Sequence, residues 1–130
     1  MQLNEYQQKA MSTCMESCDN FAYMFTGIVG EIGEFASKVA KAIRREYAVI
    51  DYNRFITEYG TNAMTEAELH DLKSEAGDIL WFIAGLCNVM GWPLDEVGQE
   101  NLDKLASRKV RGVISGDGDN RYNILIPILC

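Results

Sequence analysis

Two stretches of the chain each carry a pair of acidic residues three positions apart. Glu31 and Glu34 form the first pair, and Glu75 and Asp78 form the second. At about 100° per residue, each pair flanks the apolar stripe of its predicted helix at offsets of roughly 70° and 130°. Packing the two helices against each other would therefore bring four carboxylates to one place.

Four neighbouring carboxylates are costly without a cation. Two carboxylates about 5 Å apart, at an effective dielectric constant of about 20, repel each other by ~3 kcal/mol. A divalent cation reverses that energy, and oxygen ligands without histidine or cysteine favour Mg²⁺ or Mn²⁺ over zinc. The acids therefore predict a metal site. The alternative is two solvated helix faces, but the matched phase of the two pairs favours the metal site.

Glycines stand directly before three of these acids, at Gly30, Gly33 and Gly77. Inside a helix each glycine costs about 1 kcal/mol relative to alanine. We therefore expect a local need for small residues, either close packing of the helices or access for a ligand.

The elements that position the acids are predicted to be helices, because apolar residues recur three and four positions apart. Asn4 is the expected cap of a first helix that ends near residues 18–20. A second helix is expected over residues 21–46. Its predicted apolar stripe consists of Phe25, Ile28, Ile32, Phe35, Val39 and Ile43.

Thr65 and Glu68 form a capping box that begins a third helix, expected to reach about Met90. Pro93 suits the first turn of a fourth helix, expected to reach about Arg108. The aromatic connector, residues 47–64, is interpreted as a short helix, a lid or a partner surface. Residues 112–120 indicate a loop, and residues 123–130 an extended apolar tail. We thus predict one all-α domain over residues 1–130, with four or five helices and a short non-helical C-terminal tail.

Composition excludes several classes of protein. The chain has 130 residues, with 19 acidic against 12 basic ones and a net charge of -7. Such a balance argues against general binding to polymeric nucleic acid or anionic membranes. The longest apolar run in the body of the chain, residues 79–87, is far short of the ~20 residues of a membrane span. Four cysteines without CxxC spacing predict reduced thiols in a cytoplasmic protein. No GxxxxGK[ST] motif occurs, so a P-loop is excluded.

The segments 27–34 and 75–81 together resemble the ExxE and ExxD signature of the MazG-like, all-α nucleoside triphosphate pyrophosphohydrolases. The resemblance extends to residues 3–7 and 101–108 and covers roughly residues 3–121. It implies Mg²⁺-dependent cleavage of nucleoside triphosphates to the monophosphate and pyrophosphate. The implied catalytic and metal-binding residues are Glu31, Glu34, Glu75 and Asp78, one of which also orients or deprotonates the attacking water.

The substrate phosphates need cations as well. Lys38 and Lys41 continue the stripe of the first acid pair at helical spacing, and pairing of Lys38 with Glu34 is the alternative to a phosphate role. The resemblance implies substrate contact for Asn101 and Lys104.

Two further residues are candidates for substrate binding. Arg108 follows Lys104 by four positions near the end of the fourth helix. Phe82 projects between the two acids of its helix and is a candidate floor for a nucleobase pocket, with core packing as the alternative.

The expected substrate is a canonical or modified (deoxy)nucleoside triphosphate, in keeping with the cleaning of nucleotide pools. A phosphoribosyl-ATP pyrophosphohydrolase and a non-catalytic helical interaction module are the alternatives. Modest helices and the apolar tail, residues 124–130, leave hydrophobic surface to cover. We therefore expect a homodimer or a homotetramer that completes the helical bundle.

Overall fold

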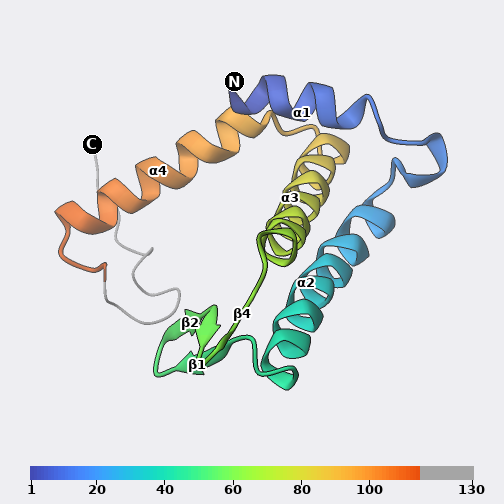
Figure 1. The fold of residues 1–130 in the computed structure, drawn as a ribbon. Coiled ribbons are helices and arrows are strands. Elements are labelled where there is room, and N and C mark those ends of the chain that lie inside the picture. The colour runs from blue at the N-terminus through green and yellow to red at the C-terminus, as the bar shows by residue number, and fades with distance from the viewer. Residues whose placement is uncertain (115–130) are drawn as a thin grey trace.

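A computed structural model describes residues 1–114 of the chain, so residues 115–120 of the predicted loop and the predicted apolar tail lie outside the described residues. The described part is mostly helical, as predicted, and Figure 1 shows α2 and α3 side by side and antiparallel, with α1 across one end of the pair. α4 leads away from that end. The helices are α1 (Leu3–Met11), α2 (Phe21–Arg44), α3 (Glu66–Val89) and α4 (Leu94–Val110).

Side-chain caps fix the starts of the two long helices. Asn20 Oδ1 accepts a hydrogen bond from the backbone N–H of Tyr23 at 2.9 Å and begins α2. At the start of α3, Thr65 Oγ1 accepts from the N–H of Glu68, and Glu68 Oε2 accepts from the N–H of Thr65. The predicted capping box is therefore confirmed.

The first helix is shorter than predicted. α1 ends at Met11, and only a 3₁₀ turn, Glu16–Cys18, follows before α2. Ser12 Oγ donates to the carbonyl of Lys9 at 2.5 Å, and Thr13 Oγ1 donates to the carbonyl of Ala10 at 2.6 Å. These hydroxyls bind carbonyls that a longer helix would use, which explains why the helix stops.

Asn4 does not cap α1, whose cap position is Gln2, two residues earlier. Instead Asn4 Oδ1 accepts from the N–H of Asp95 at 2.8 Å, in the first turn of α4. Asp95 Oδ1 accepts from the N–H of Asn4 in return, at 3.3 Å. The polar start of α1 thus binds another helix.

Gln7 joins α1 to the junction between α3 and α4. Its buried side chain donates to the carbonyls of Ala84 and Trp92 at 3.2 and 3.0 Å and accepts from the N–H of Leu94 at 3.0 Å. Each hydrogen-bonding atom of the amide therefore has a partner, which offsets the cost of burial. This junction holds α4 at a bend of 100° from α3.

The connector between α2 and α3 forms two antiparallel hairpins, which the all-α prediction does not include. Val49 lies opposite Ile56 in the first hairpin, and Glu58 lies opposite Ala63 in the second. β-Branched and aromatic residues on either side of short turns favour strands. At the second turn Gly60 has a φ of +62°, which glycine adopts without strain. The strands are β1 (Val49–Asp51), β2 (Arg54–Ile56), β3 (Glu58–Tyr59) and β4 (Asn62–Ala63).

Near α1, glycines bring α2 and α3 into close contact. A Cβ atom at Gly27 would lie 2.0 Å from the ring of Phe82, and one at Gly85 would lie 2.3 Å from the sulfur of Met24. Met24 is fully buried and Phe82 is 9% exposed. This end of the helix pair is therefore the tightly packed one.

The predicted apolar stripe of α2 is only partly buried. Phe25 and Ile32 are each 52% exposed, whereas Met24 and Ala42 are buried. The buried face is thus rotated from the predicted stripe, because Met24 rather than Phe25 enters the contact with α3. Part of the predicted stripe is therefore exposed in a single chain.

Within residues 1–114, no single helix has the length and apolar character needed to cross a membrane. The bent pair of α3 and α4 meets these criteria of length and composition only when the two are taken together.

Candidate metal centre

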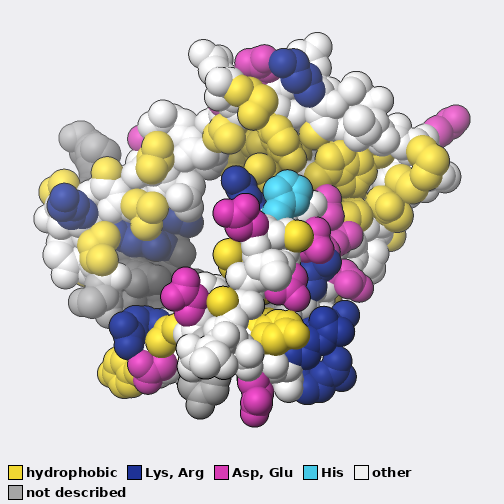
Figure 2. Space-filling model, in the orientation of Figure 1, with side chains coloured by type: hydrophobic (Ala, Val, Ile, Leu, Met, Phe, Trp, Pro, Cys, Tyr) yellow, Lys and Arg dark blue, Asp and Glu magenta, His cyan; other side chains and the backbone are white. Residues whose placement is uncertain are grey.

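Three carboxylates from two helices meet where α2 and α3 face each other. Glu31 comes from α2, and Glu75 and Asp78 come from α3. One oxygen of each lies within 4.8 Å of an oxygen of the others. The i,i+3 spacing places the two acids of α3 on one face of the helix, and the antiparallel packing of α2 brings the third opposite them. Figure 2 shows acidic side chains gathered over this part of the helix pair.

The donor set fits a hard divalent cation. All three donors are carboxylate oxygens, which suit Mg²⁺, Mn²⁺ or Ca²⁺ rather than zinc. Two oxygens on opposite sides of one Mg²⁺ are about 4.2 Å apart, given a Mg–O distance of ~2.1 Å. Small side-chain rotations would bring the oxygens of Glu31, Glu75 and Asp78 within that span.

Glu31 lies where its negative charge is unfavourable without a cation. Partial burial raises the pKa of its carboxyl group above the ordinary value. The negative charges of Asp78, Glu75 and Glu34 raise the pKa further, in that order. A cation bound here would offset both effects, because it stabilises the ionised carboxylate.

Lys38 is the cation that the chain itself provides to this centre. Its Nζ lies 3.1 Å from Oε1 of Glu75, whose side chain is only 14% exposed. The hydrogen bond to Glu75 is the main cause that raises the pKa of the Lys38 ammonium group. The considered pairing with Glu34 on the same helix is not the one found, because α3 offers Lys38 a less exposed partner.

Glu34, the fourth predicted ligand, stands apart from the other three. It is exposed and does not belong to the group of close carboxylates. It lies three residues from Glu31 on α2, and its charge contributes to the raised pKa values of Glu31 and Lys38. Glu34 is therefore a neighbour of the centre, available to a group bound there.

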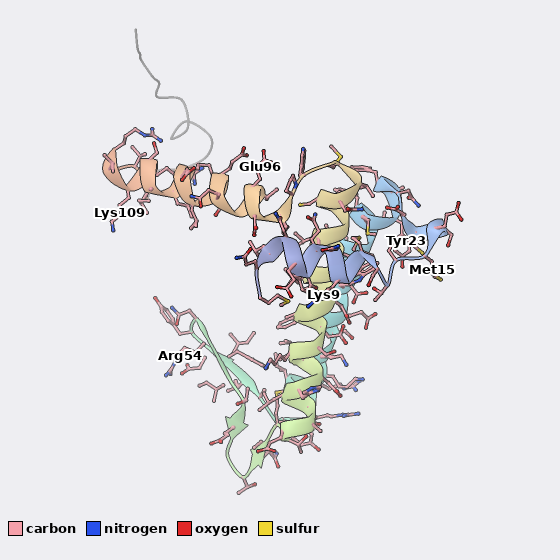
Figure 3. All side chains as sticks on the ribbon, turned by 90° about the horizontal axis from the view of Figure 1, so that it is seen from above. Lys9, Met15, Tyr23, Arg54, Glu96 and Lys109 are labelled. Atoms are coloured by element: carbon pink, nitrogen blue, oxygen red, sulfur yellow. The ribbon has the colours of Figure 1, made fainter. Side chains whose placement is uncertain are left out.

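The predicted substrate residues on α4 lie on a separate arm of the molecule. Asn101 and Lys104 line a groove with Trp92 and Glu96. Figure 3 shows α4, marked by Glu96 and Lys109, extending away from the helix pair that carries Tyr23. Within one chain, these residues are not brought to the acidic centre.

Arg108 is buried near the C-terminal end of α4, with 5% of its surface exposed. Its backbone carbonyl accepts a hydrogen bond from the N–H of Val113 at 3.0 Å. The structure thus places this predicted substrate residue on the arm rather than at the acidic centre.

Phe82 lies inside the protein, as the alternative of core packing proposes. Its ring contacts Tyr23 at 5.5 Å and Trp81 at 5.0 Å between ring centroids. Trp81 Nε1 donates to the carbonyl of Ala10 at 3.1 Å and to Thr13 Oγ1 at 3.0 Å. These aromatic side chains therefore hold α1 and α2 against α3.

The three glycines beside the acids do not serve packing within the described chain. Apart from the flanking residues and the backbone of the same helix, no described atom lies within 4 Å of a Cβ added at Gly30, Gly33 or Gly77. Of the two alternatives, close helix packing within the chain is not found at these positions, and access for a ligand remains the interpretation. Gly27 and Gly85 are the glycines that allow the close approach.

Tyr6 is a neighbour of the centre that sequence reasoning did not single out as a site residue. It is half-buried, and burial together with the charge of Asp78 raises the pKa of its phenol group. Its only sequence signal is the apolar spacing along α1, which gives no sign that Asp78 lies nearby.

Comparisons with known proteins agree with this arrangement. A family model described as the MazG nucleotide pyrophosphohydrolase domain matches residues 20–112, which include all three carboxylates of the centre. The Gene 37 protein of Mycobacterium phage L5 is 38% identical over 128 residues, covering 93% of this chain and 100% of that relative. No solved structure matches the chain.

Proposed function

The chain belongs to the MazG nucleotide pyrophosphohydrolase family, and on that premise we propose that it hydrolyses nucleoside triphosphates to the monophosphate and pyrophosphate in a Mg²⁺-dependent reaction. One observation carries the metal dependence. Glu31, Glu75 and Asp78 place carboxylate oxygens within 4.8 Å of one another without histidine or cysteine. Canonical and modified deoxynucleotides are the proposed substrates.

Glu31, Glu75 and Asp78 would hold the Mg²⁺ ion. When bound, Mg²⁺ supplies charge neutralisation for the phosphate oxygens and an acidified water. We assign Glu34 the task of orienting the attacking water, because its carboxylate is exposed beside the centre and outside the ligand group. Lys38 brings a positive charge to the same place.

The reaction needs no covalent intermediate with the protein. The water oxygen forms a bond to phosphorus, and the anhydride bond between the α- and β-phosphates breaks. The bridging oxygen keeps the electron pair, and the proton lost by the water passes to Glu34 or to solvent. The chain's residues position the two reactants and balance charge, which is most of what phosphoryl transfer requires.

The test is a substrate panel with product analysis. Purified protein is incubated with each nucleoside triphosphate, each deoxynucleotide and phosphoribosyl-ATP, with Mg²⁺, with Mn²⁺ or with EDTA. We expect monophosphate and pyrophosphate, detected by ³¹P NMR, only when a metal is present. Turnover of phosphoribosyl-ATP alone would favour a phosphoribosyl-ATP pyrophosphohydrolase. Absence of turnover across the panel, with no effect of Mg²⁺ on the melting temperature, would support a non-catalytic interaction module.

We also propose that a second copy of the chain covers the exposed apolar face of α2. Phe21 and Phe25 stack at 5.7 Å between ring centroids and are 54% and 52% exposed. Val29 and Ile32 are 63% and 52% exposed on the same helix. Exposed apolar patches of this kind mark interaction sites.

Sedimentation of the wild type should give the mass of a dimer or a tetramer. Ile32→Asp should reduce that mass, whereas the matched change Ile50→Asp on β1 should leave it unchanged. A monomeric wild type would contradict this proposal.

A further inference from the structure

A second feature lies beside the acidic centre, in a pocket at the C-terminal end of α2. The pocket has a volume of about 170 Å³ and lies between α2, the start of α3 and the chain around Tyr47. Lys38 and Lys41 line it from α2, and Arg45 lines it from the C-terminal cap of that helix. Figure 2 shows Lys and Arg side chains gathered beyond the acidic ones, toward this end of α2.

The wall of the pocket is part of the hydrophobic core. Ala42 and Met64 are buried in one cluster, and the half-buried Tyr47 packs against that cluster. Residues that line the pocket are therefore held in place by packing, even though its cations are on the surface. A rigid wall reduces the entropy lost when a ligand binds.

Two of the cations are not neutralised within the described chain. Lys9 and Arg54 have acidic partners at 2.6 and 2.7 Å, whereas Lys41 and Arg45 form no ion pair with any of residues 1–114. Glu68 and Asp71 also line the pocket. The Glu68 carboxylate is bound to the N–H of Thr65 in the capping box and keeps its negative charge, so three cations face two carboxylates in the pocket.

The pocket and the acidic centre adjoin each other through Lys38. This residue lines the pocket, and its Nζ binds Glu75 of the centre. At 1.5 Å of rise per residue, Lys41 lies about 4.5 Å and Arg45 about 10.5 Å further along α2 than Lys38. A ligand held at the centre can therefore extend along this row of cations.

We propose that the pocket binds the two terminal phosphates of the substrate, which leave as pyrophosphate, and that Lys41 and Arg45 are its binding residues. The inference rests on the proposed function, because it takes the triphosphate as the ligand. The pocket is smaller than the ~300–1,000 Å³ of sites for drug-sized ligands, so it suits the diphosphate part and not a whole nucleotide. Arginine and lysine are the side chains that bind phosphate oxygens most strongly. The nucleoside then points toward α1.

The test compares three neighbouring cations of α2 in the full-length protein. Lys41→Met and Arg45→Met remove cations of the pocket. Arg44→Met removes the same charge one residue away, from a side chain that lines a different depression. For each variant, pyrophosphate binding in the presence of Mg²⁺ is measured by calorimetry, and KM and kcat are measured for the best deoxynucleotide.

We expect Lys41→Met and Arg45→Met each to weaken pyrophosphate binding by about tenfold and to raise KM by a similar factor, since hydrogen bonds to charged groups are the stronger ones. Binding of the nucleoside monophosphate should stay unchanged. This contrast distinguishes a site for the diphosphate from a site that binds any phosphate group. Arg44→Met should match the wild type in all these measurements. Circular dichroism and the melting temperature show that each variant is folded.

The outcomes separate the subsite from the proposed function. Loss of pyrophosphate binding in Arg45→Met but not in Arg44→Met supports the subsite even if no triphosphate is hydrolysed. Wild-type turnover together with unchanged pyrophosphate binding and KM in both pocket variants would overturn the subsite and leave the proposed function standing. Equal weakening in all three variants would also overturn it, because that result indicates only general electrostatic attraction.

Discussion

Near α1, helices α2 and α3 contact each other through Gly27 and Gly85, whereas further along they face each other through carboxylates. In the first region a methyl group has no room beside Phe82. In the second region, a Cβ added at Gly30 would meet no described atom within 4 Å beyond its own helix backbone and flanking residues. One helix pair thus combines a packed region, which contributes stability, with an open charged region, which costs stability and is available to a ligand.

Removing one acid from the charged region should have the largest effect. Asp78→Asn should lower the rate of nucleotide hydrolysis by more than about 100-fold, since residues that only support metal ligands already change activity by roughly 10- to 100-fold. The unfolding free energy in EDTA should stay the same or rise, because a repulsive charge is removed. Steady-state rates and urea unfolding measure the two effects.

Glu58→Gln on β3 is the matched control, because it removes one exposed carboxylate far from the centre in sequence. It should leave the rate within about twofold of the wild type, as surface changes usually have small effects. Wild-type turnover by Asp78→Asn would remove Asp78 from the proposed site.

The packed region should be destabilised when a side-chain atom is added rather than when a charge is removed. Gly27→Ala should lower the unfolding free energy by about 1–3 kcal/mol or more, because the new methyl group overlaps the buried ring of Phe82. Urea denaturation monitored by circular dichroism measures the loss. A variant as stable as the wild type would contradict the close contact between Gly27 and the ring of Phe82.

Local signals in the sequence were sufficient to predict the helices, but not to predict which face of each helix is buried. The capping box of Thr65 and Glu68 and the spacing of the acids depend on residues three apart, so both could be predicted. The rotation of α2 could not, because periodicity gives equal weight to Phe25 and to residues that enter the core. The side chain that packs depends on Gly85 of α3, which receives Met24.

The same reasoning explains the other differences. The hairpins have strands of two or three residues, too short for a clear alternating pattern. The direction of α4 depends on the buried hydrogen bonds of Gln7, which join positions 77 to 87 residues apart in the chain. Which glycines permit close packing, Gly27 and Gly85 rather than those beside the acids, could not be predicted, because composition alone does not show which glycine faces another helix.

Gly30→Ala tests the open part of the same helix pair and should have a smaller effect of opposite sign. Alanine should raise the unfolding free energy by up to about 1 kcal/mol, because it is the better helix former and meets no described atom. If ligand access is the reason for this glycine, KM for the nucleotide should rise while stability improves. Higher stability with an unchanged KM would contradict the ligand-access interpretation.

The smallest expected effect is a pH dependence that differs between the metal-free and the Mg²⁺-bound protein. Burial and the neighbouring carboxylates raise the pKa of Glu31 in the folded state, so the folded state binds this proton more tightly than the unfolded chain does. The stability of the metal-free protein should therefore fall as the pH rises from the ordinary glutamate pKa of about 4.3 through the raised value. Mg²⁺ requires the ionised carboxylate, so the stabilisation by Mg²⁺ should grow over the same range. Melting temperatures with EDTA and with Mg²⁺ measure both slopes, and Glu31→Gln should reduce each of them. Parallel slopes with and without Mg²⁺ would show that the proton on Glu31 and the metal do not compete, and would remove Glu31 from the ligand set.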